Sequence, residues 1–68
     1  MADRILRRPE VERRVGLARP TIYKLIQQGR FPRPVKLTGR SVGWHEQEIA
    51  EWIASRERVQ PHAAHATP

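Results

Sequence analysis

The segment between Gly16 and Gly29 constrains the fold of this chain more than any other part of it. Three apolar residues recur there at the spacing of one helical face: Ile22, Leu25 and Ile26. The other positions are mostly polar or cationic, and glycine favours the left-handed geometry that ends helices. The segment is therefore predicted to form a short amphipathic helix, from about Arg19 to Gln28, with Ala18 as a weak N-cap.

A helix is also predicted just upstream, over about residues 9–15. Pro9 suits the first turn of a helix, because its missing N–H has no helical partner there. Val11 and Val15 lie four residues apart and form a buried stripe, and Gly16 supplies a left-handed stop. Two helices joined by a glycine-containing turn, the second with hydrogen-bonding and cationic groups on its outer face, indicate a helix-turn-helix whose second helix enters a DNA groove.

The next part of the chain predicts a β-hairpin. Residues 31–34 hold two prolines, which disfavour helical geometry in the residues before them. Apolar residues then alternate with Lys36 and Gly43 on the two sides of a turn at residues 38–41. This pattern is typical of two strands with one apolar face, and Gly39 supplies a positive φ angle if the turn requires one.

A third helix is predicted from about Glu46 to Arg56, with apolar residues on one face. If His45 is its N-cap, Trp44 and Ile49 are the two halves of a hydrophobic staple. Glutamates near the start of this helix and arginines near its end suit the helix dipole.

These elements predict a mainly α-helical winged helix-turn-helix domain over residues 1–58, with a two-stranded wing and a C-terminal helix. Residues 1–4 are expected to be loose, and Ile5–Leu6 to be an extended segment that pins the N-terminus to the core. Residues 59–68 are expected to be a disordered tail. The predicted core comprises the apolar residues of the inner faces: Leu6, Val11, Val15, Leu17, Ile22, Leu25, Ile26, Phe31, Val35, Leu37, Val42, Trp44, Ile49, Trp52 and Ile53.

The net charge of the chain, +6, is unevenly distributed. Residues 1–43 carry +8 and residues 44–68 carry −2, and between Arg13 and Arg40 there are eight basic residues and no acidic one. A basic half joined to a mildly acidic half favours binding to a polyanion. A merely solvated cationic face is the alternative.

The 68 residues contain no cysteine, which excludes disulfides and thiolate metal sites and fits the cytoplasm. No apolar run is long enough to span a membrane, and the N-terminus lacks an apolar signal core. The expectation is a soluble cytoplasmic protein that associates with the nucleoid through double-stranded DNA.

The outer face of the helix predicted over residues 19–28 carries the first candidate DNA-binding side chains. Arg19 is at the N-terminal end, where recognition helices meet bases, and either pairs with guanine, contacts a phosphate or is solvated. Gln27 either pairs with adenine or is ordinary helix surface, and Lys24 is expected to bind a phosphate. The remaining candidates on this helix are Gln28, Thr21 through its hydroxyl or backbone N–H, and Tyr23, which either packs or offers its hydroxyl to a phosphate.

The wing predicted over residues 35–44 supplies the second set of candidates. Arg40, at its tip, is free to meet a phosphate or enter a minor groove, unless it is only a solvated turn residue. Lys36 and Ser41 are expected to contact the DNA backbone. The Arg13–Arg14 pair at the end of the first helix either reaches flanking phosphates or is solvated.

No catalytic, metal or cofactor site is predicted. Of the three histidines, His62 and His65 lie in the tail with no Cys or carboxylate nearby, and together with His45 they do not make a metal site. No Ser/His/Asp set, carboxylate pair or glycine-rich phosphate loop is recognisable, so the protein is not expected to be an enzyme. Trp44 and Trp52 are at core spacing and are expected to pack rather than to stack on bases.

A series of short motifs runs along most of the chain: Glu10-Val11, Gly16-Leu17, Arg19, Thr21-Ile22-Tyr23, Gly29-Arg30-Phe31-Pro32, Pro34-Val35-Lys36-Leu37, Gly39-Arg40, Val42-Gly43-Trp44, and Glu48 with Trp52-Ile53. The series resembles the AlpA-type prophage regulators, small DNA-binding proteins related to phage excisionases and to MerR-like winged helices. The resemblance covers about residues 4–56 and implies a regulator of prophage or mobile-element genes, in some members one that promotes excision by activating an integrase gene. The family usually has a hydroxyl residue before the recognition-helix arginine and a small polar residue after it. Here these are Ala18 and Pro20, so the family's sequence preference is not carried over.

The leading interpretation is a sequence-specific double-stranded DNA-binding transcriptional regulator of a prophage or mobile element. It reads the major groove with residues 19–28 and contacts flanking backbone or minor groove with residues 35–44. One alternative is an excision factor that binds and bends attachment-site DNA and contacts an integrase. Another is a cationic module that binds RNA or an acidic protein, although the exposed aromatic platform expected for single-stranded RNA is lacking. A monomer that binds beside a second copy on adjacent sites is expected.

Overall fold

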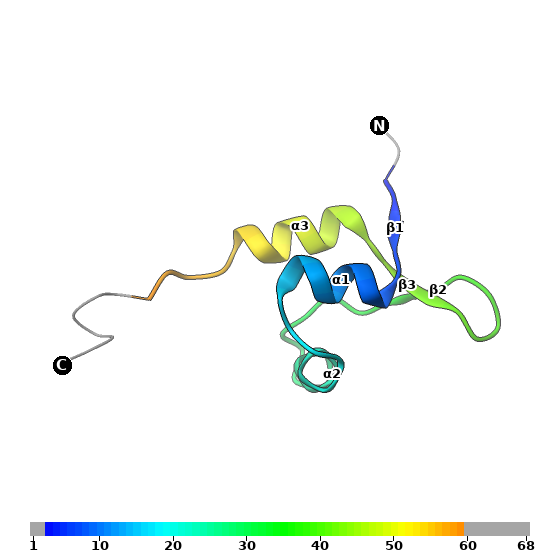
Figure 1. Cartoon of the computed structure of the whole chain (residues 1–68), viewed down its shortest axis with the longest axis horizontal. Helices are drawn as coiled ribbons and strands as arrows, with labels where there is room; N and C mark the ends of the chain where they lie inside the picture. The colour runs from blue at the N-terminus through cyan, green and yellow to red at the C-terminus, as the bar shows by residue number, and fades with distance from the viewer. Residues whose placement is uncertain (1–2, 60–68) are drawn as a thin grey trace.

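The computed structural model describes residues 3–59 and contains three helices and a small antiparallel sheet (Figure 1). The elements follow in the order β1 (Ile5–Leu6), α1 (Arg8–Val15), α2 (Arg19–Gln27), β2 (Val35–Lys36), β3 (Val42–His45) and α3 (Glu46–Ala54). This confirms the predicted winged helix-turn-helix, with helix ends within two residues of those predicted. Of the predicted tail, only Val59 belongs to the described residues, where it is exposed.

The sheet has three strands in the order β1-β3-β2, so the predicted two-stranded hairpin is incomplete. Ile5 pairs with His45 in β3 on one side, and Val35 pairs with Gly43 on the other, both antiparallel. The extended segment was expected from the sequence, but its partner was not, because two residues carry no signal that says which edge they join. The sheet thereby ties the N-terminus to the strand that leads directly into α3.

Gly43 of β3 lies against the backbone and side chains of β1. It is buried, and a Cβ atom at this position would clash with the side chain of Ile5 and lie 2.9 Å from the carbonyl oxygen of Leu6. No other residue type fits there without displacing β1, since the neighbouring atom is backbone. The glycine therefore allows β1 and β3 to pair.

The core lies between the sheet and the three helices. Trp44 of β3 and Ile22 of α2 are completely buried, so α2 attaches to the body through its apolar face. The other buried side chains are Leu6, Val11, Phe31 and Ile49. Partly buried apolar residues pack around them: Val15, Leu17, Tyr23, Leu25, Ile26, Val42 and Trp52.

The prediction of a core position is wrong for two residues. Leu37 is 39% exposed, because it follows β2 at the point where the chain leaves the body to form the wing loop. Ile53 is 40% exposed, because the last turn of α3 extends beyond α1 (Figure 1). Gly39 supplies no positive φ angle to the wing turn, since Gly16 and Gly29 are the positive-φ residues of the part of the chain described.

Asp3 holds the start of α3, so the expectation that residues 1–4 are loose is wrong for this residue. His45 is the N-cap residue, as predicted, but its side chain makes no capping hydrogen bond. The Asp3 carboxylate instead accepts a hydrogen bond from the Gln47 backbone N–H, at 3.1 Å, and pairs with His45 Nδ1, at 3.0 Å. The backbone N–H of Glu46 donates to the carbonyl of Arg4, at 2.8 Å. The carboxylate thus satisfies a free N–H of the first helical turn from a distant part of the chain.

Replacing Gly43 with alanine is expected to lower the free energy of unfolding by about 1–3 kcal/mol, because the added methyl group overpacks the β1–β3 contact. Gly39→Ala is the matched control: a Cβ there meets nothing within 4 Å, and its φ angle is not positive. Chemical denaturation of the two variants and the wild type measures the difference. Equal stability of the two variants would show that β1 does not pair as described.

The Asp3 contact predicts an acid-sensitive contribution to stability. Burial raises the pKa of Asp3, but hydrogen bonds from Gln47, His45 and Arg4 outweigh it and hold the pKa below its ordinary value of 3.8. A group with a depressed pKa in the folded state stabilises the fold above its unfolded pKa, and this is lost as the pH falls through the folded value. Asp3→Ala is therefore expected to melt at a lower temperature than the wild type near neutral pH, with the gap closing below about pH 4. Glu57→Ala, which removes an exposed carboxylate after α3, is the control, and a gap that is independent of pH contradicts the assignment.

Candidate nucleic-acid interface

The outer face of α2 is a polar and cationic surface. Pro20 lies in the first turn, where it sets helical geometry without the help of the N-cap, since Ala18 makes no side-chain hydrogen bond. Ile22 turns inward, and α2 lies at one edge of the molecule, seen end-on in Figure 1. Five predicted site residues are exposed on this helix and its end: Arg19, Thr21, Lys24, Gln27 and Gln28.

Tyr23 lies at the boundary between this surface and the core. Its ring is half-buried and packs against the core cluster. The guanidinium carbon of Arg19 lies 5.7 Å from the centroid of that ring, within the range of a cation–π contact. The tyrosine therefore has a packing role and also supports the arginine at the N-terminal end of the helix.

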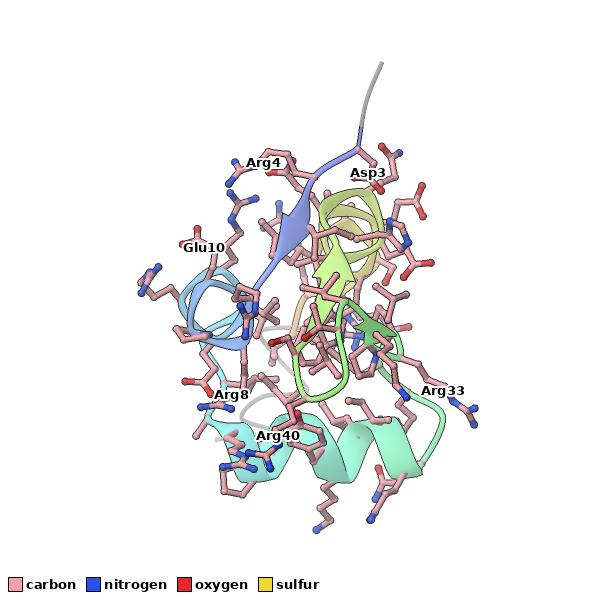
Figure 2. All side chains as sticks on the ribbon, turned by 90° about the vertical axis from the view of Figure 1, so that its right-hand side faces the viewer. Asp3, Arg4, Arg8, Glu10, Arg33 and Arg40 are labelled. Carbon is pink, nitrogen blue, oxygen red and sulfur yellow. The ribbon has the colours of Figure 1, made fainter. Side chains whose placement is uncertain are left out.

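The wing is a loop closed by two hydrogen bonds to one carbonyl. The backbone N–H groups of Leu37 and Thr38 both donate to the carbonyl oxygen of Ser41, at 2.8 and 3.3 Å. Lys36 and Arg40 are exposed, and Ser41 is half-buried. The structure thus places all nine predicted site residues on two elements, α2 with its end and the wing. The labelled Arg40 in Figure 2 marks the wing.

One cation near the wing was missed by the sequence analysis. Arg7, just before α1, is exposed and donates a hydrogen bond from Nε to the carbonyl oxygen of Val42, at 3.1 Å. It therefore lies at the base of the wing, next to β3. The sequence contains no signal for this contact, because the two residues are 35 positions apart.

None of the ion pairs found among residues 3–59 involves a side chain of α2 or of the wing, residues 35–44. Glu10 accepts hydrogen bonds from Arg13 and Arg14, and Arg14 also reaches Glu46, at 2.8 Å. The remaining pairs are Arg8–Glu12, Arg4–Glu46 and His45–Asp3. Hydrogen bonds from Arg13 and Arg14 hold the pKa of Glu10 below its ordinary value of 4.5, so this carboxylate is charged at neutral pH.

This partition decides which cations remain available to a polyanion. Arg13 and Arg14, expected either to reach flanking phosphates or to be solvated, each pair with a carboxylate of α1 or α3. None of the cations of α2 or the wing forms an ion pair among the described residues. Acidic side chains thus compensate arginines of α1 and the N-terminal segment and leave the cations of α2 and the wing uncompensated, which is the electrostatic pattern of a nucleic-acid-binding surface.

Two further exposed cations, Arg30 and Arg33, lie between α2 and β2 and had no role in the sequence analysis. They form no ion pair within residues 3–59. The sequence did hold a signal for them: Arg30 and Arg33 lie on either side of the apolar Phe31, within the stretch from Arg13 to Arg40 that has basic residues and no acidic one. Only the structure shows that neither arginine has a carboxylate partner among the described residues.

None of the three helices described between residues 3 and 59 has the length and apolar character that a membrane crossing requires. In the same part of the chain, no three His, Cys, Asp or Glu side chains gather as a metal-binding group would.

Comparison with known proteins gives three matches. Residues 4–57 match the family described as Prophage CP4-57 regulatory protein (AlpA). The DNA-binding transcriptional activator AlpA of Escherichia coli (strain K12) is 43% identical over 61 residues, which cover 81% of this chain and 87% of that protein. The uncharacterized protein ORF88 of Enterobacteria phage P4 is 48% identical over 54 residues, which cover 79% of this chain and 61% of that protein.

The chain therefore spans about three-fifths of the phage P4 protein and most of the Escherichia coli one. The family match includes all six helices and strands of the structure and both elements of the cationic surface. By this match, the chain belongs to the AlpA family of prophage regulatory proteins.

Proposed function

We propose that this protein is a sequence-specific double-stranded DNA-binding transcriptional regulator of a prophage or mobile element. The observation that carries the proposal is the exposed cationic surface of α2 and the wing, where no cation pairs with a carboxylate of the described residues, whereas Arg8, Arg13 and Arg14 of α1 all do. The family and the similarity to a DNA-binding transcriptional activator support it. The protein acts on DNA in the bacterial cytoplasm and has no enzymatic step of its own.

In the proposed complex α2 enters the major groove. Arg19, at the N-terminal end of the helix, makes a bidentate contact to guanine, and Gln27 faces a second base. Lys24 binds a phosphate. The hydroxyls of Thr21 and Tyr23 and the amide of Gln28 add contacts at the groove edge.

The wing lies over the neighbouring backbone or minor groove. Arg40 makes the main contact, with Lys36 and Ser41 on phosphates beside it. Arg7, at the base of the wing, extends this positive surface toward α1.

An excision factor that binds and bends attachment-site DNA, in contact with an integrase or with a second copy, uses the same surface. A competition experiment separates the two functions. Attachment-site DNA that displaces promoter DNA, together with a bend in the bound duplex, identifies an excision factor. Preference for the promoter identifies a regulator. A preference for single-stranded RNA over any duplex contradicts both and indicates an RNA-binding module.

Substitution of Arg19 is expected to reduce sequence-specific affinity, and substitution of Arg40 is expected to reduce affinity for any duplex. On a site selected from random duplexes, Arg19→Ala is expected to cost about 1–3 kcal/mol, with little loss on random DNA, because it removes a base contact. Arg40→Ala is expected to weaken binding to both, because phosphates are the same in every sequence. Arg58→Ala, which removes an exposed arginine after α3, is the control and is expected to leave affinity unchanged within about twofold. Equal losses for Arg19→Ala on both duplexes would assign that residue to the backbone.

The cationic surface also predicts a steep salt dependence. If about five to seven cations displace counterions from phosphates, the logarithm of the binding constant falls with the logarithm of salt concentration at a slope of roughly −4 to −6. Titrations of a fluorescent duplex at several salt concentrations measure the slope. A slope near zero contradicts binding through this surface.

A further inference from the structure

The segment of residues 29–34, here called the strap, connects α2 to β2 and is held by two tryptophans. Trp52 of α3 donates a hydrogen bond from Nε1 to the carbonyl of Arg30, at 2.8 Å. Trp44 of β3 donates from Nε1 to the carbonyl of Pro32, at 2.9 Å. Phe31, between these two carbonyls, is only 5% exposed, and its ring meets that of Trp52 edge to face at 4.8 Å. Hydrogen bonds and aromatic packing therefore hold the inner side of the strap against the core.

The strap is also fixed at both ends. Gly29 has a φ angle of 73°, and the backbone N–H groups of Gly29 and Arg30 donate to the carbonyls of Ile26 and Leu25, at 3.0 and 2.8 Å. This pair of bonds is a Schellman motif, which sets the direction in which the chain leaves a helix. Beyond it, Pro32 and Pro34 restrict the backbone φ angle. The strap thus has little conformational freedom to lose when it binds a partner.

The carbonyls of Arg30 and Pro32 and the ring of Phe31 face the core, whereas the side chains of the two arginines of the strap are on its outer side. Arg30 and Arg33 are both exposed. Glu48 and Glu51 of α3 line the same groove as these arginines, yet neither forms an ion pair with them. In Figure 2, where α2 runs across the foot of the molecule, Arg33 reaches outward past the C-terminal end of the helix, and Arg40 lies toward its N-terminal half.

We propose that the strap is a second phosphate-binding element, in which Arg30 and Arg33 contact the DNA backbone beyond the C-terminal end of α2. The proposal rests on the proposed DNA-binding function. It places α2 between two backbone contacts, one from the wing and one from the strap. Charged groups held on a rigid backbone bind a phosphate at a lower entropic cost than flexible side chains on a loose loop. Trp52 acts as a positioning residue through its hydrogen bond to Arg30.

Phosphate-ethylation interference and salt titration test the strap. The variants are Arg30→Ala with Arg33→Ala, the same two positions as Lys, and Arg58→Ala as control, which removes an exposed arginine after α3. The double alanine variant is expected to bind selected and random duplexes several-fold more weakly, and to reduce the magnitude of the salt slope by about 1.8, or about 0.9 per lost phosphate contact. The lysine variant and Arg58→Ala are expected to keep the wild-type slope.

The interference pattern distinguishes the two contacts. Loss of the strap arginines is expected to abolish interference at phosphates on one flank of the site, whereas Arg40→Ala abolishes it on the other flank. If the wild type and Arg40→Ala behave as described but the double alanine variant keeps its slope and its full pattern, the strap proposal is wrong and the DNA-binding function stands. If the wild type binds no duplex, the proposed function fails, and the strap proposal fails with it.

The role of Trp52 is tested by Trp52→Phe, which keeps an aromatic ring against Phe31 and removes the N–H donor. This variant is expected to lower DNA affinity while Arg30 and Arg33 are present, and to cause no further loss when both are alanine. Circular dichroism at the titration temperature checks that each variant is folded. Equal losses in the two backgrounds overturn the positioning role.

Discussion

The burial of Trp44 is the interaction on which the rest of this structure depends. The residue lies in the central strand, pairs with Leu6 of β1 and is completely buried. Its indole N–H holds the carbonyl of Pro32, and the next residue but one begins α3. A single residue therefore connects β1, the segment after α2 and the last helix. In a domain with so few buried residues and no disulfide, such a contact replaces a larger core.

The position of α2 follows from this arrangement. The helix is attached through one apolar face centred on Ile22 and through the strap that leaves its C-terminal end. Both attachments are on the inner side, so the whole outer face is available to a ligand. The two indole hydrogen bonds to the strap thus serve the core and also set where Arg30 and Arg33 lie.

The distribution of carboxylates matters as much as that of the cations. Glu10, Glu12 and Glu46 pair with arginines of α1 and of the N-terminal segment. Surface ion pairs of this kind contribute little to stability. Their consequence is electrostatic: they compensate positive charge on α1 and the N-terminal segment, whereas the cations of α2 and the wing have no carboxylate partner among the described residues.

Most of the local structure was predictable. The glycines at 16 and 29, the proline in the first turn of each of the first two helices and the apolar spacing at Ile22, Leu25 and Ile26 predicted α1 and α2 nearly to the residue. The alternation around residues 38–41 predicted the wing. The same outer-face reasoning selected six candidate site residues on α2 and its end, of which five are exposed and Tyr23 is half-buried. These signals are local, since they depend on residues within one or two turns of each other.

What the sequence by itself determined is therefore which segments are helices or strands and which face of each is apolar, because backbone geometry and side-chain periodicity act over a few neighbouring residues. Only the tertiary structure decided that β1 joins β3, that Asp3 caps α3, that Leu37 and Ile53 stay exposed, and that Arg14 reaches Glu46 whereas Arg30 and Arg33 meet no carboxylate of the described residues. Each of these outcomes depends on which distant groups meet across the folded chain. An arginine has the same local pattern whether a carboxylate 32 residues away lies beside it or not, as Arg14 and Glu46 show.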